Sequence, residues 1–128
     1  IINSPTNPTG ALMSDAAARE VAAAAVKRDL WVVVDLCYDR LVYDGTPHRV
    51  ARIFSETMHD RLVLCGSASK SFAMTGWRCG WLAGPRAVTS AGSALQSHET
   101  SNASSITQKA AVAALTGPQQ CVTDMLSE

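Results

Sequence analysis

Residues 61–81 read RLVLCGSASKSFAMTGWRCGW, and the rest of the chain is arranged around them. The short apolar run at the start of this stretch predicts a buried strand. Two serines, Ser67 and Ser69, come next, followed by Lys70 and, eight residues later, by Arg78. Hydroxyl groups, one amine and one guanidinium near a strand end suit an anionic group beside a carbonyl carbon that the amine attacks. The alternative is that Lys70 and Arg78 are solvated loop cations.

A second polar position lies in the loop at the start of the chain. Ile1 and Ile2 predict the end of a strand, and the sequence then turns through Asn-Pro-Thr-Gly at residues 7–10. Because a proline biases the residue before it away from helix, Asn7 lies on a constrained loop. Its amide can be held in one orientation toward a ligand, although an Asn-Pro turn without a ligand is the other interpretation.

A carboxylate and a phenol follow the next predicted strand. The apolar run of residues 31–35 is typical of a parallel strand buried on both faces, and Asp35 stands at its carboxyl end. Open α/β sheets bind ligands at that end of their strands, and Tyr38 is close enough in sequence to point into the same crevice. The alternative is that Asp35 caps a helix and Tyr38 is a core aromatic residue.

Helical patterns alternate with these strands. Ser14 is a good N-cap for an alanine-rich helix that ends near Arg28. At helical spacing, one face that can cover the sheet is formed by Val21, Ala24, Ala25 and Arg28. Residues 41–43 predict an edge strand or a helix end. Further helices are expected at about 50–54, 87–96, 104–115 and 119–128, with a polar break at 97–102 and another strand at 80–84. This order predicts a three-layer α/β/α fold with a mostly parallel sheet.

The composition excludes several classes of protein. The 128 residues are 47% hydrophobic and 17% charged, which is typical of a globular chain. The 11 basic and 11 acidic residues balance, and no basic cluster indicates nucleic acid or an anionic membrane as a partner. No apolar run is long enough to span a bilayer, and no signal peptide is predicted.

Cysteine and histidine spacing indicates neither a disulfide framework nor a metal site. The four cysteines contain no Cys-x-x-Cys pair, which favours a reducing cytoplasm, and the histidines are scattered without the spacing of metal ligands. Each histidine is expected to be structural or on the surface.

Four motifs in this order resemble the class I/II pyridoxal-phosphate-dependent aminotransferases of fold type I. They are Asn-Pro-Thr-Gly at 7–10, Asp-x-x-Tyr at 35–38, Ser-x-Ser-Lys at 67–70, and an arginine eight residues after the lysine. Each motif alone is weak, and their order makes them specific. The resemblance runs from Asn7 to the helix after Asn102, and it implies that residues 1–128 are part of the large cofactor-binding domain.

The resemblance also implies a role for each site residue. Lys70 is expected to bind pyridoxal 5'-phosphate covalently and to move a proton during catalysis, while Asp35 pairs with the pyridine nitrogen. Tyr38 and Asn7 are expected to donate hydrogen bonds to the phenolate oxygen of the cofactor. The phosphate is expected to lie on the remaining residues of the site, Ser67, Ser69 and Arg78.

The activity that the resemblance implies is transfer of an amino group between an amino acid and a 2-oxo acid. The segment Met-Thr-Gly-Trp-Arg-x-Gly-Trp at 74–81 resembles the branch with aspartate and aromatic aminotransferases. The full-length protein is then expected to be a cytoplasmic homodimer. Because other parts of such enzymes supply a phosphate loop, a stacking aromatic residue and the substrate clamp, we expect residues 1–128 alone to be weakly active or inactive.

Other functions share the same cofactor residues. A carbon–sulfur lyase or an aminocyclopropane-carboxylate synthase would use all of them. A non-catalytic, aminotransferase-like regulatory domain would bind the cofactor without turnover.

Overall fold

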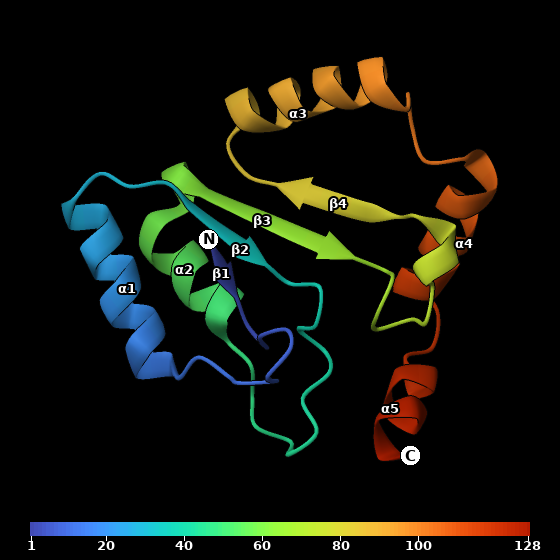
Figure 1. Cartoon of the computed structure of the whole chain (residues 1–128), viewed down its shortest axis with the longest axis horizontal. Coiled ribbons are helices and arrows are strands. Elements are labelled where there is room, and N and C mark those ends of the chain that lie inside the picture. Colours follow the sequence, from blue (N-terminus) through green and yellow to red (C-terminus); the bar gives the residue numbers. More distant parts are fainter.

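The computed structural model describes residues 1–128 as an α/β fold with a four-stranded sheet (Figure 1). In chain order its elements are β1 (Ile2–Asn3), α1 (Asp15–Lys27), β2 (Val32–Asp35), α2 (Val50–Met58), β3 (Leu62–Ser67), β4 (Gly80–Ala83), α3 (Arg86–Glu99), α4 (Ser105–Thr116) and α5 (Gln120–Ser127). Two short 3-10 helices, η1 (His59–Arg61) and η2 (Thr75–Trp77), precede β3 and β4. None of the helices has the length and apolar character needed to cross a lipid bilayer.

The sheet is mostly parallel, as predicted. Its strands follow the order β1-β2-β3-β4, and β1 and β3 both run parallel to β2. The exception is β4, which is antiparallel to β3. Residues 68–79 form no long crossover helix, so the chain turns back beside β3, where an antiparallel neighbour needs no crossover. Since the carboxyl ends of β2 and β3 meet at the same edge, Asp35 and Ser67 both leave the sheet there.

Helix α1 begins where the sequence predicts but turns a different face inward. The Ser14 hydroxyl accepts a hydrogen bond from the Ala17 N–H at 3.2 Å, which confirms the N-cap. The buried positions are Ala18, Ala22 and Ala25, whereas Val21 is exposed, so the predicted face was wrong apart from Ala25. Alanine is small enough to let α1 and α2 pack closely, which decides the face in favour of the smallest side chains.

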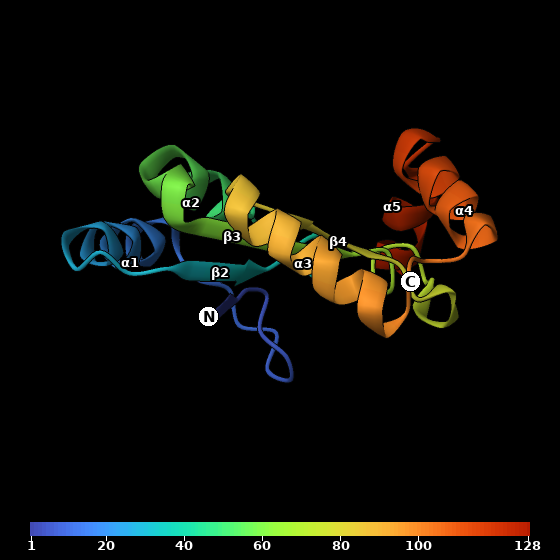
Figure 2. The same ribbon diagram turned by 90° about the horizontal axis from the view of Figure 1, so that it is seen from above.

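The hydrophobic core lies between α1, α2 and the sheet. Its fully buried members include Phe54 and Ile53 from α2 and Val34 from β2, and Leu62 of β3 belongs to the same cluster. Both views place α1 and α2 at one end of the sheet and α4 with α5 at the other (Figures 1 and 2). The core is therefore concentrated in the first half of the chain.

Helix α3 lies along β4, on the side of the sheet away from this core. Leu82 is the Cα partner of Cys65, which follows the core-facing Leu64, so Leu82 points to the opposite face. Gly92 of α3 packs there, because a Cβ at this position would come within 3.1 Å of Leu82 Cδ2. No residue of α3 is buried, so this layer is thinly packed.

Three predicted segments differ from the structure by more than one residue. Residues 41–43 lie in a loop and form neither an edge strand nor a helix end. Helix α2 continues to Met58, because Met58 extends the buried face that Ile53 and Phe54 begin. Helix α3 continues to Glu99, so the polar break begins at Thr100.

Replacing Phe54 with alanine is expected to lower the free energy of unfolding by about 3–5 kcal/mol, because this side chain is 0% exposed and its loss leaves a cavity. Urea unfolding measures the change. Tyr43→Ala is the matched control, since that aromatic side chain is 77% exposed and its removal should change stability by no more than about 0.5 kcal/mol. Equal losses in the two variants would contradict the placement of the core.

Candidate active site

An amide and a phenol from two separate loops meet at the carboxyl edge of the sheet. Asn7, in the loop after β1, donates a hydrogen bond from Nδ2 to Tyr38 Oη at 3.2 Å. The backbone N–H of Asn7 donates to Asn3 Oδ1 at 2.9 Å, which fastens the loop to the end of β1. Because Tyr38 Oη accepts the bond from Asn7, its own O–H remains free to donate.

The amine of Lys70 lies over the same phenol. Its Nζ is 5.8 Å from the centroid of the Tyr38 ring, within the range of a cation–π contact. Lys70 occupies the turn that follows β3, is exposed, and forms no ion pair. Loops after β1, β2 and β3 therefore bring an amide, a phenol and an amine together.

The carboxylate of Asp35 lies at the same edge, half-buried. Its Oδ1 accepts a hydrogen bond from the Cys37 N–H at 2.9 Å, and the carboxylate forms no ion pair. Burial raises the pKa of the Cys37 thiol, and nearby Asp35 raises it further, whereas Lys70 acts in the opposite direction. Asp35 and Lys70 therefore both lie near the Cys37 thiol and shift its pKa in opposite directions.

A second group of polar residues joins the end of β3 to the start of β4. The Ser67 hydroxyl donates to the carbonyl of Cys79 at 3.3 Å and accepts a bond from the Ser69 N–H at 3.0 Å. Arg78 directly precedes Cys79, so it lies beside Ser67. Its guanidinium is exposed, forms no ion pair, and donates from Nη1 to the Thr75 carbonyl at 3.1 Å.

The structure thus gathers the predicted residues into two neighbouring groups. In the first group Tyr38 contacts both Asn7 and Lys70, and in the second Ser67 bonds to Ser69 and to Cys79, which follows Arg78. No hydrogen bond or ion pair joins Asp35 to Lys70.

Sequence reasoning missed the side chain that anchors the start of the Asn7 loop. Ser4 is 1% exposed, and its Oγ lies 3.1 Å from His48 Nε2 and accepts a bond from the Met13 N–H at 3.0 Å. Burial lowers the pKa of the His48 imidazole, against the opposing effect of two nearby carboxylates, Asp39 and Asp15. His48 and Ser4 are 44 positions apart, and no sequence pattern links residues at such a separation.

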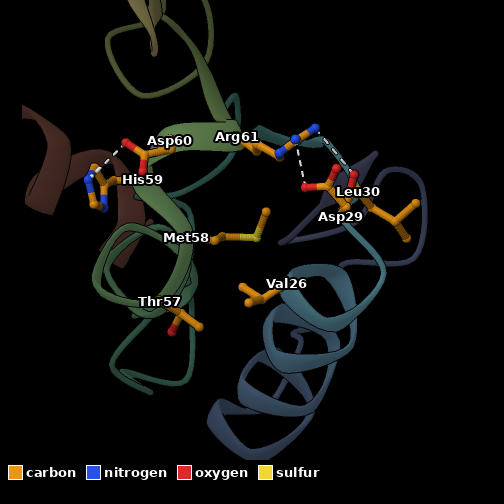
Figure 3. A pocket seen from close by; sticks show the side chains of 8 residues that line it. All are labelled: Val26, Asp29, Leu30, Thr57, Met58, His59, Asp60 and Arg61. Carbon is orange, nitrogen blue, oxygen red and sulfur yellow. Dashed lines mark hydrogen bonds and ion pairs between the residues drawn. The ribbon is translucent and has the colours of Figure 1, made fainter.

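The structure also contains a small cavity at the opposite end of the strands (Figure 3). It measures about 210 Å³ and lies where β2 and β3 begin. Its polar side chains contact one another: Arg61 lies 2.6 Å from Asp29, and His59 lies 3.0 Å from Asp60. This cavity is therefore separate from the edge that carries the predicted site residues.

The groups at the carboxyl edge fit the chemistry of pyridoxal phosphate. No ion pair within the chain involves Lys70, Asp35 or Arg78, although Asp35 ends β2 and the other two lie on the loop between β3 and β4. An amine suits the carbonyl of the cofactor, a carboxylate its protonated ring nitrogen, and a guanidinium its phosphate. The phenol of Tyr38 has a hydrogen free for an anionic oxygen.

Several known proteins are similar to this chain in both sequence and fold. Residues 1–128 match the family described as aminotransferase class I and II. The aspartate aminotransferase of Geobacillus stearothermophilus is 39% identical over 125 residues, which cover 98% of this chain and 32% of the relative. The crystal structure of the aspartate aminotransferase from Rhizobium meliloti superimposes with a TM-score of 0.93 at 37% identity, over 98% of this chain and 32% of that one.

An aromatic aminotransferase from Pyrococcus horikoshii superimposes with a TM-score of 0.90 at 33% identity, over 99% of this chain and 34% of that one. The chain thus spans about a third of the length of the relatives it matches, and the α/β fold is confirmed. The family depends on pyridoxal 5'-phosphate. Because the family match includes every residue, the chain belongs to the class I and II aminotransferases.

Proposed function

We propose that residues 1–128 are part of the large cofactor-binding domain of a pyridoxal-phosphate-dependent aminotransferase. The whole protein would transfer an amino group between an amino acid and a 2-oxo acid. The observation that carries this proposal is the meeting of Asn7, Tyr38 and Lys70 at the carboxyl edge, beside the unpaired carboxylate of Asp35.

Lys70 is assigned the covalent and proton-transfer roles. Its amine is exposed and forms no ion pair, so it is free to attack a carbonyl carbon. With the cofactor and a substrate bound, Nζ would accept the proton from the substrate Cα and deliver it to the former carbonyl carbon of the cofactor. The cation–π contact with Tyr38 keeps this amine near the phenol.

Asp35, Tyr38 and Asn7 are assigned to the ring. Pyridoxal phosphate, when bound, supplies an electron sink for the negative charge that develops at the substrate Cα. The Asp35 carboxylate, oriented by the Cys37 N–H, would keep the proton on the ring nitrogen. The O–H of Tyr38 would donate to the ring oxygen, and Asn7 would hold that phenol in place through their hydrogen bond.

Ser67, Ser69 and Arg78 are assigned to the phosphate. The Ser67 hydroxyl already lies between the Ser69 N–H and the Cys79 carbonyl, so its position is defined before any ligand arrives. Arg78 carries a planar donor group suited to a two-pronged contact with phosphate oxygens.

Aspartate is the first amino donor to test, because similar proteins from several bacteria are aspartate aminotransferases. We further propose a homodimer in the cytoplasm as the working form of the full-length protein.

The test is product analysis with the full-length protein, pyridoxal phosphate, aspartate and 2-oxoglutarate. Formation of glutamate and oxaloacetate in equal amounts supports transfer. Ammonia and pyruvate from a sulfur-containing amino acid, without glutamate, would instead indicate a carbon–sulfur lyase. Cofactor binding with no product from any amino acid would indicate a regulatory domain, and either result would overturn the proposed activity.

A further inference from the structure

Arg78 adopts a backbone conformation that residues with a Cβ rarely adopt. Its φ is 52° and its ψ is 52°, in the left-handed region, at the point where η2 ends and the chain turns into β4. This region is disfavoured for any residue other than glycine, and surrounding contacts must hold such a residue there.

The peptide is held by a side chain from α4. Thr107 is 7% exposed, and its Oγ1 donates a hydrogen bond to the carbonyl of Trp77 at 3.0 Å. That carbonyl belongs to the peptide between Trp77 and Arg78. The backbone N–H of Trp77 donates to the Met74 carbonyl at 3.2 Å, so both backbone polar groups of Trp77 have partners.

The hydroxyl of Thr107 is itself oriented by the N-cap of α4. Ser104 Oγ accepts a bond from the Thr107 N–H at 3.1 Å and donates to Thr107 Oγ1 at 3.0 Å. Since Oγ1 accepts this bond, its own hydrogen is directed to the Trp77 carbonyl. The first turn of α4 therefore ends in one donor aimed at the η2 turn.

This contact lies in the wall of an open cavity. Trp77, Arg78, Ser104 and Thr107 all line one cavity of about 740 Å³. The guanidinium of Arg78 is exposed, and its hydrogen bond from Nη1 to the Thr75 carbonyl at 3.1 Å joins it to the first residue of η2. Because that carbonyl and the Arg78 backbone both belong to the η2 turn, the conformation of this turn constrains where the guanidinium can reach.

We propose that Thr107 is a positioning residue for Arg78, and that its bond to the Trp77 carbonyl directs the Arg78 guanidinium to the phosphate of the cofactor. This inference rests on the proposed function, because it takes Arg78 as a phosphate ligand. It makes the start of α4 a part of the phosphate site, although Thr107 touches no ligand.

The test compares two ligands that differ only in the phosphate, pyridoxal 5'-phosphate and pyridoxal, in the full-length protein. Thr107→Val keeps the shape of the side chain but removes the donor, and it should weaken binding of pyridoxal phosphate by about 10-fold. Binding of pyridoxal should change by less than about 2-fold. Thr107→Ser keeps the hydroxyl and should bind both ligands as the unchanged protein does. Absorbance of the lysine-bound ligands during titration gives both dissociation constants.

Several outcomes overturn the inference. One is an unchanged affinity of Thr107→Val for pyridoxal phosphate. Another is an equal loss of affinity for both ligands, which would mean that Thr107 has a purely structural role. If Thr107→Val does not fold, Ser104→Ala replaces it, because this variant leaves the Thr107 hydroxyl unoriented. A loss of affinity for pyridoxal phosphate alone supports the proposal, and an unchanged affinity contradicts it. If the unchanged protein binds neither ligand at Lys70, the result contradicts the proposed function as well.

Discussion

Replacing Lys70 with alanine is expected to abolish the absorbance of lysine-bound pyridoxal phosphate and to lower turnover by more than about 10³-fold. The variant loses both the amine that attacks the cofactor carbonyl and the base at the substrate Cα. A general base alone contributes about 10²–10⁴-fold to the rate of a reaction. Absorbance after addition of the cofactor and glutamate formation with aspartate measure the two effects in the full-length protein.

Lys27→Ala is the control for the Lys70 variant. Lys27 is exposed in the last turn of α1, away from the carboxyl edge of the sheet, so its removal should leave both the absorbance and the turnover nearly unchanged. Retention of the absorbance in Lys70→Ala would show that another amine binds the cofactor and would remove Lys70 from its role.

Replacing Asp35 with alanine is expected to slow removal of the substrate Cα proton by about 10²–10³-fold, the usual cost of losing a preorganised electrostatic partner. Without the carboxylate, the ring nitrogen loses the charge that keeps it protonated, and the ring becomes a weaker electron sink. Attachment of the cofactor to Lys70 should persist, because the amine is untouched. Exchange of deuterium from the Cα of aspartate measures the proton-removal rate, and absorbance measures attachment.

Asp35→Asn separates charge from shape. Its amide oxygen can still accept the hydrogen bond from the Cys37 N–H, which Asp35 accepts at 2.9 Å, so the local backbone should stay in place. We expect this variant to exchange deuterium nearly as slowly as Asp35→Ala. A rate close to that of the unchanged protein would show that the orientation of the loop matters and that the charge does not.

Much of the fold could be predicted because local patterns encode it. The Ser14 N-cap fixes the start of α1 through a bond to a residue three positions away, and the apolar runs before Asp35 and Ser67 predict two strands correctly. The sequence also contains the signal for the end of α2, since Met58 continues the helical spacing of Ile53 and Phe54. Polar residues between Phe54 and Met58 made this signal hard to recognise. The inward face of α1 could not be predicted, because the close packing of α1 against α2 favours alanine over valine at the contact.

For the candidate site, the sequence predicts a set of residues but not how they are arranged. Motif order predicted Asn7, Tyr38 and Lys70, yet only the folded chain shows the amide bonded to the phenol and the amine over its ring. No pattern predicted Ser4 with His48, or Thr107 with Trp77, since each pair joins distant segments.

By itself, the sequence determined the strands, most helices and the chemical groups at the strand ends, because these depend on neighbours a few positions apart. Only the tertiary structure decided that β4 runs antiparallel, that three loops converge at one edge, and that α4 reaches the peptide before Arg78. Such contacts depend on the path of the whole chain, since burial and hydrogen bonding are settled by which distant segments come to lie side by side.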